Sequence, residues 1–183
     1  MTYPTSCTAF AGAQRIAGGP PADVAAALRR HLDWYPGAAV LVFDDATAQP
    51  VEFDLRGTAE EVAARLAAPP RGRGRPRLGV QAREVTLLPR HWDWLAAQPG
   101  GASVALRKLV DAARASSITR DRIREAQVAA HRFMTAMAGN APGYEEALRA
   151  LYAGDRGKFD RMTAAWPKDV RAFAMALAKD AFG

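Results

Sequence analysis

The sequence predicts an α+β protein, and two patterns in the chain support that class. Residues 1–68 alternate between strand-like and helix-like patterns in the order ββαββα, and the chain after residue 89 is almost entirely helical in pattern. A stretch rich in Pro, Gly and Arg separates the two parts. We therefore expect four regions: a small α+β domain at 1–68, a basic linker at 69–82, a strand–helix–helix unit at 83–116, and a helical C-terminal region at 117–183.

The first strands and the first helix are predicted from turn residues and apolar spacing. Residues 7–19 (CTAFAGAQRIAGG) are typical of a hairpin that turns around residue 12. A helix over 20–34 is expected because Pro stands at its start and because Val24, Leu28 and Leu32 follow at four-residue spacing.

Two further strands and a helix complete the N-terminal domain. The apolar residues 38–43 and the alternating residues 51–55 (VEFDL) each predict a strand. Thr58 precedes Glu61 by three residues, which is the capping-box pattern at the start of a helix.

The remaining chain predicts a series of helices bounded by Gly, Pro or a capping residue. The helix predicted at 103–116 is expected to begin at Ser103 as its N-cap, and one of its faces carries Leu106, Val110 and Ala113. On the helix predicted at 89–101, Trp92 and Trp94 are two residues apart and therefore point to different faces. One is expected to face a core and the other a protein partner or a base. The predicted segments are 89–101, 103–116, 119–140, 142–154, 155–166 and 167–182.

The positive charge of the chain is concentrated in one segment. The net charge is +6 and the sequence pI is about 10.0. Residues 71–77 hold four arginines and no acid, so the rest of the chain carries only +2. A local excess of this kind favours an anionic partner such as nucleic acid, an acidic protein or a membrane surface.

The basic segment contains Arg-Gly-Arg-Pro, which resembles the core of an AT-hook. The minor groove of A·T-rich DNA is narrow and strongly negative, and it attracts arginine side chains. Gly74 lets the backbone approach the groove floor, and Pro76 keeps the segment extended. The resemblance implies A·T-rich DNA as partner. The DNA-binding residues that it implies here are Arg71, Arg73, Gly74, Arg75, Pro76 and Arg77.

Two other interpretations of the same segment stay open. Alternating Pro, Gly and Arg also suit an extended, solvated linker between domains. Segments of Arg and Gly also bind single-stranded RNA without strict sequence requirements.

Residues 83–114 (REVTLLPRHWDWLAAQPGGASVALRKLVDAAR) resemble a ribbon-helix-helix unit of the MetJ/Arc type. In that family the strand pairs with its copy in a second subunit, and the resulting ribbon enters the major groove. The resemblance implies a homodimer, places Arg83, Val85 and Leu87 at base-reading positions, and assigns the amide of Ser103 to a phosphate. Val85 and Leu87 are apolar, which departs from the polar readers of the family. The strand alternatively joins the main core.

Over nearly its full length the chain also resembles an uncharacterised bacterial family, classed as a domain of unknown function. Residues 74–114 and 143–178 carry the resemblance most clearly. It implies a bacterial cytoplasmic protein and no particular activity.

No pattern in the sequence predicts an enzyme, a metal or a cofactor. His31, His91 and His131 lie far apart, and Cys7 is single, so it is expected to be buried in a strand and to form no intramolecular disulfide. The helix that holds Arg120, Arg122, Arg124 and Arg132 is expected to present a solvated basic face, with a second phosphate track as the alternative.

These observations favour a non-enzymatic DNA-binding protein, either a transcriptional regulator or a nucleoid-associated protein. Arg71, Arg77 and Arg83 would contact phosphates beside the hook. No signal peptide and no bilayer-spanning run is visible, so we expect a cytoplasmic protein of the nucleoid without a membrane partner. The alternative is an adaptor that binds a protein partner through its helical C-terminal region, with the basic segment only a linker.

Overall fold

The computed structural model describes residues 3–67 and 83–182, so the basic segment 71–77 lies outside the described residues. Contacts divide the chain into two units, one formed by Met1–Pro69 with Arg122–Gly183 and the other by Pro70–Asp121. The elements confirm the predicted α+β class, since a small antiparallel sheet is followed by a mostly helical chain.

The sheet of the first unit begins with the predicted hairpin. Strands β1 (Cys7–Ala11) and β2 (Gln14–Gly19) pair antiparallel, and Gly12 takes the left-handed conformation that the tight turn requires, with φ of 55°. Strand β3 (Val40–Asp44) pairs antiparallel with the other edge of β1, so the strand order is β2-β1-β3.

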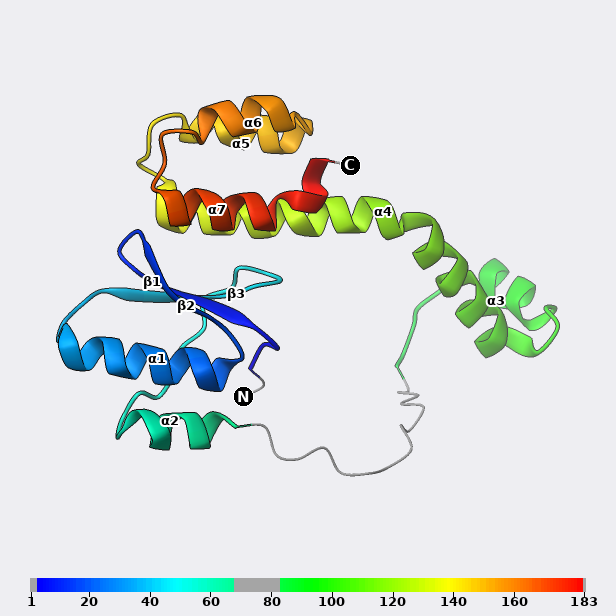
Figure 1. Cartoon of the computed structure of the whole chain (residues 1–183). Helices are drawn as coiled ribbons and strands as arrows, with labels where there is room; N and C mark the ends of the chain where they lie inside the picture. Colours follow the sequence, from blue (N-terminus) through cyan, green and yellow to red (C-terminus); the bar gives the residue numbers. More distant parts are fainter. Residues whose placement is uncertain (1–2, 68–82, 183) are drawn as a thin grey trace. The chain divides into compact units, whose positions relative to one another are not determined.

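One face of the sheet is covered by α1 (Pro21–Trp34), and α2 (Ala59–Leu66) packs against α1 (Figure 1). Side chains alternate along a strand, so every second residue of β1 points to this face. The buried cluster between the sheet and α1 consists of Cys7, Ala9, Val24, Leu28 and Val42.

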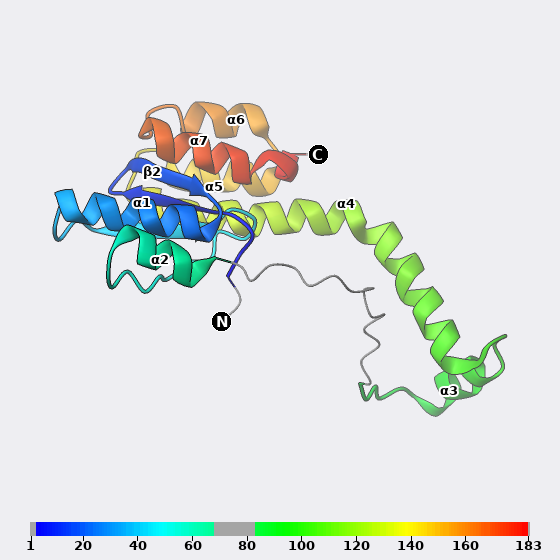
Figure 2. The same cartoon turned by 60° about the horizontal axis from the view of Figure 1, so that its bottom comes forward.

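The opposite face of the sheet packs against the C-terminal part of α4 (Gly101–Ala138) and against α7 (Lys168–Leu177) (Figure 1). Helices α5 (Tyr144–Ala153) and α6 (Arg156–Met162) lie on the far side of these two helices, and together with the short η1 (Lys179–Phe182) they complete the same core (Figure 1, Figure 2). Phe10 and Phe43 project from the strands into this larger core, where they meet Phe133 and Phe173.

The units follow different boundaries from those expected from the sequence. Residues 1–68 and 117–183 were expected as separate regions, and the structure shows them sharing the core around Phe133. The amphipathic C-terminal helices need an apolar surface to cover, and the sheet supplies it.

The predicted strand at 51–55 was wrong. In the described chain, pairing beyond β3 amounts to an isolated bridge between Phe43 and Pro50. On either side of it the Val51 N–H donates to the Val42 carbonyl and the Asp44 N–H donates to the Gln49 carbonyl, each at 2.9 Å. The carbonyls of Asp54 and Arg56 accept hydrogen bonds from the Arg65 guanidinium at 2.8 and 2.5 Å instead of joining a ladder.

The helices predicted at 103–116 and from 119 onward form one helix, α4. No Gly or Pro interrupts the chain between Ala102 and Ala138. The Ser116 hydroxyl donates to the carbonyl of Ala113 at 2.8 Å, and the Ser117 hydroxyl donates to the carboxylate of Asp121 one turn later at 2.6 Å. These polar residues therefore bond within the helix and do not end it.

Candidate nucleic-acid interface

The second unit, Pro70–Asp121, is built around a helical hairpin. Its described part begins with an irregular segment at 83–88, followed by α3 (Pro89–Ala96), which has Pro at its first position as predicted. The turn into α4 passes through Gly100 and Gly101, with φ of 88° and 75°. A Cβ on Gly100 would lie 3.1 Å from Val104, so the tight turn favours glycine on both counts.

The hairpin buries very little of its own apolar surface. Among its described residues, only Leu95 and Ala105 are buried. The large apolar side chains that stay 40–60% exposed are Val85, Leu88, Trp92, Trp94, Leu109, Val110 and Ile118. Exposed apolar side chains that gather in one small unit are a feature typical of interaction surfaces.

Two predictions about this surface are corrected by the structure. Trp92 and Trp94 are both exposed, at 40% and 52%, so neither is the core residue that was expected; the adjacent Leu95 occupies the interior position. Val110, which was placed on the apolar face of its helix, is 53% exposed because the described hairpin offers that face no partner. The apolar spacing in the sequence predicted this apolar face of the helix, but it did not predict that the face is exposed.

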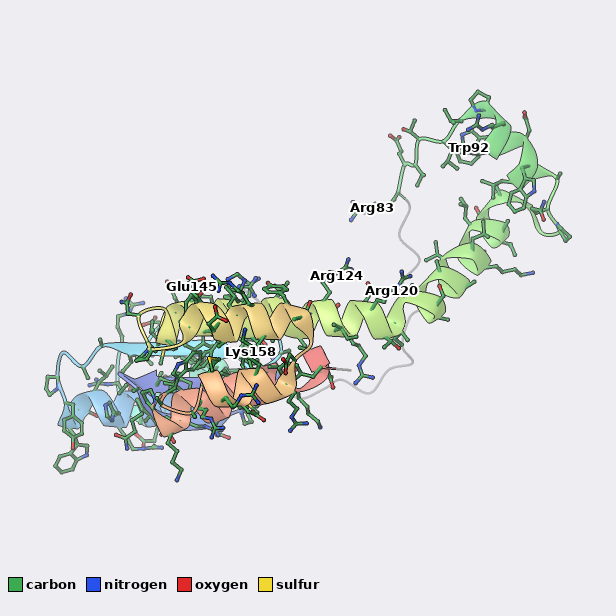
Figure 3. The ribbon with its side chains drawn as sticks, turned by 90° about the horizontal axis from the view of Figure 1, so that it is seen from above. Arg83, Trp92, Arg120, Arg124, Glu145 and Lys158 are labelled. Atoms are coloured by element: carbon green, nitrogen blue, oxygen red, sulfur yellow. The ribbon has the colours of Figure 1, made fainter. Side chains whose placement is uncertain are left out.

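The strand predicted at 83–88 is not formed in the described chain: these residues have no regular secondary structure and pair with no strand. Arg83 is exposed on this segment and Trp92 on α3 (Figure 3). Helix α4 begins at Gly101, so Ser103 lies inside the first turn and is not the N-cap. Its backbone amide still belongs to the group that has no carbonyl partner within a helix.

The charge of the chain follows the division into two units. Residues 70–121 contain ten Lys or Arg and four Asp or Glu, which is a net charge of +6. The rest of the chain contains fifteen of each, so it is formally neutral. The whole excess positive charge of the protein therefore belongs to this unit and to the basic segment with which it begins.

Arg120, Arg122 and Arg124 are exposed on α4, as the expected solvated face requires, while Arg132 is half-buried. Arg122 pairs with Asp180 of η1 at 3.1 Å, and Arg132 donates to the carbonyl of Thr47. Arg124 also has a partner, and Figure 3 shows it on α4 beside the exposed Arg120. Arg122 and Arg132 therefore help to hold the first unit together.

Cys7 is buried in β1, as expected for a lone cysteine in a strand. Burial raises the pKa of its thiol to about 11, with a further contribution from the negative charges of Asp45 and Asp44. Asp45 is held by Thr8, whose hydroxyl donates to it at 2.7 Å, and by Ser6. The thiol is therefore protonated at neutral pH, which is the opposite of what a nucleophilic cysteine requires.

The described residues contain no group of His, Cys, Asp and Glu that could hold a metal ion. His31 packs on Tyr35, and His131 shares a hydrogen bond of 2.9 Å between its Nδ1 and the Tyr152 hydroxyl. None of the helices in the described ranges combines the length and the apolar character needed to cross a membrane.

The fold and the charge distribution define a small α+β protein with an added basic helical hairpin. The chain belongs to the family described as uncharacterized protein conserved in bacteria (DUF2239), whose model matches residues 6–178. This match confirms the full-length resemblance seen in the sequence. No curated protein and no solved structure matches the chain.

Proposed function

We propose that this protein is a non-enzymatic DNA-binding protein that grips the minor groove of A·T-rich DNA through residues 71–77. The observation that carries the proposal is the placement of the entire net charge, +6, in residues 70–121. A focused positive unit attached to a neutral one attracts a polyanion to a single place. Arg73 and Arg75 enter the groove, while Arg71, Arg77 and Arg83 contact phosphates.

The helical hairpin supports this role as a dimerisation unit. Its exposed apolar side chains, among them Leu109 and Val110, pack against a second copy, and the segment at 83–88 pairs with its equivalent. Ser103, in the first turn of α4, offers its amide to a phosphate. A dimer holds two basic segments on one DNA, and the second segment binds at a high effective concentration, which raises the affinity. Regulation of transcription or organisation of the nucleoid follows from such binding.

The proposal is tested by titrating the full chain into labelled duplexes of A·T-rich and G·C-rich sequence across a salt series. The three phosphate contacts of Arg71, Arg77 and Arg83 give a slope of log K against log salt of about −2.7 for one copy of the chain. We expect tighter binding to A·T-rich duplex, because the guanine amine obstructs the minor groove. The double variant Arg73→Ala/Arg75→Ala should lose that preference, and its affinity should depend less steeply on salt.

A matched control removes the same charge from the first unit. Arg30 and Arg156 are exposed there, and Arg30→Ala/Arg156→Ala should keep the A·T preference. If the two double variants lose affinity equally, or if the wild-type protein ignores base composition, the basic segment is a spacer.

One observation favours an adaptor as the second candidate function. A shallow groove of about 390 Å³ lies between α4 and α5, and its lining includes Val128 and Tyr152, which are 44% and 50% exposed. This groove lies in the helical C-terminal region where a protein partner was expected. Val128→Lys should abolish binding of such a partner and leave binding of DNA unchanged.

A further inference from the structure

A second groove in the first unit carries positive charge without a counter-charge. It has a volume of about 360 Å³ and lies beside α7, lined by Ala164, Trp166, Lys168, Arg171, Ala172 and Met175. Two of these six residues are cationic and none is acidic. The volume falls at the lower end of the range for small-molecule sites.

Arg171 is the unusual residue of this groove. Its Nε atom is buried and has no hydrogen-bond partner, and it is one of only two such side-chain atoms within the described residues. The other, Asp160 Oδ1, does not line the groove. A buried guanidinium N–H without an acceptor from the protein is costly, and a water or an anion in the groove supplies such an acceptor.

Lys168 lies one helical turn before Arg171, on the same face of α7. In the described chain no carboxylate forms an ion pair with either side chain. The nearest acid in sequence, Asp169, faces β2, where it accepts the backbone N–H of Arg15 at 3.0 Å. The groove therefore presents two positive charges that no neighbouring carboxylate neutralises.

The lining of the groove other than its two cations is apolar. Trp166 is 4% exposed, and its indole N–H donates to the carbonyl of Pro142 at 2.9 Å, which fixes the ring. Met175, which also lines the groove, contributes a polarizable thioether. A ligand with a small organic body and an anionic head would satisfy both parts of this site.

We propose that this groove binds the phosphate group of a small phosphate monoester. The guanidinium offers a planar fork and the ammonium offers a point charge, a pair that suits the tetrahedral oxygens of phosphate. A monoester carries a charge of about −1.5 to −2 at pH 7, which matches two cations better than a carboxylate does. This site lies outside the basic hairpin and does not depend on the proposed binding of DNA.

The test uses the ¹⁵N-labelled full chain, titrated with phenyl phosphate at constant ionic strength. The Nε–H signal of Arg171 and the indole N–H signal of Trp166 report from inside the groove. We expect both signals to shift and to saturate. Lys168→Ala, which leaves both reporters in place, should weaken binding about tenfold or more, because it removes a charge-assisted contact. Lys179→Ala, an exposed lysine away from the groove, should have no effect.

Parallel titrations separate the possible sources of the anion. Benzoate tests a carboxylate, and a duplex without terminal phosphates tests the backbone phosphodiester. An equal response to either, or no saturable shift with phenyl phosphate, overturns the proposal. A response to phenyl phosphate alone supports it, whether or not the Arg73→Ala/Arg75→Ala variant changes DNA binding, so the two proposals fail independently.

Discussion

The ring of Phe10 in β1 lies 5.5 Å from the ring of Phe133 in α4, measured between centroids. This contact joins the first strand of the chain to a helix more than a hundred residues later. Phe133 also meets Phe43 and Phe173, with centroids at 5.2 and 4.7 Å, and all three rings are at least nine-tenths buried. The N-terminal sheet and the C-terminal helices are therefore halves of one core.

Truncation of Phe133 should destabilise the whole first unit. Phe133→Ala removes a fully buried ring from the centre of the cluster, and we expect a loss of about 3–5 kcal/mol in the free energy of unfolding. Urea denaturation followed by circular dichroism measures this change. Val128→Ala, an exposed position on the same helix, should cost less than about 0.5 kcal/mol. Similar losses in the two variants would contradict a shared core.

Local chemistry made several elements predictable from the sequence. The hairpin at 7–19 and the helix that begins near Pro21 follow from turn residues and apolar spacing. The capping box is also present, since the Thr58 N–H donates to Glu61 at 2.9 Å and the Glu61 N–H donates to Thr58 at 3.2 Å. Each of these signals is contained within a few residues.

The errors arise where distant residues decide the outcome. The alternation of residues 51–55 is that of a strand, but Pro50 lacks an amide donor and the carbonyl of Asp54 is taken by Arg65. The apolar spacing of α4 marks an apolar face at Val110 without showing what covers it. The groove beside α7 leaves no pattern in the sequence, because lysine and arginine three residues apart usually belong to a solvated surface.

The capping box of α2 provides a second prediction. Thr58→Ala removes the acceptor for the Glu61 N–H, and loss of such a cap costs about 1 kcal/mol. Thermal or urea unfolding measures it. Thr58→Ser keeps a hydroxyl at the same position and should retain most of the stability. An equal loss in both variants would show that the methyl group, not the hydrogen bond, matters.

The buried thiol of Cys7 predicts a dependence of stability on alkaline pH. The unfolded chain loses the thiol proton near 9.0 and the folded chain near pH 11, so between these values the unfolded state binds fewer protons. The stabilising contribution is therefore fully present below about pH 9 and is lost as the pH rises toward 11. Cys7→Ala has no thiol to titrate, so its unfolding free energy should fall less steeply over this window. Parallel curves for the two proteins, from denaturation at each pH, would contradict the assigned shift.

The exposed apolar side chains of Leu109 and Val110 on α4 predict a dimer that charged substitutions at these positions disrupt. Leu109 and Val110 are 49% and 53% exposed, and two lysines in their place would bring unpaired charges into an interface between copies. We expect the wild-type chain of 19.7 kDa to sediment at twice that mass, and Leu109→Lys/Val110→Lys to sediment as a monomer. Leu41→Lys, at an exposed apolar position on the first unit, should remain dimeric.

The same pair of variants separates dimerisation from binding of DNA. A monomer holds only one basic segment, so the Leu109→Lys/Val110→Lys protein should bind a single A·T-rich site more weakly than the dimer does, although its arginines are intact and it gains positive charge. If the wild-type chain sediments as a monomer over the concentrations at which it binds DNA, these exposed apolar side chains have another partner. The basic segment would then act in one copy, and its affinity would depend only on the phosphates and the groove that it contacts.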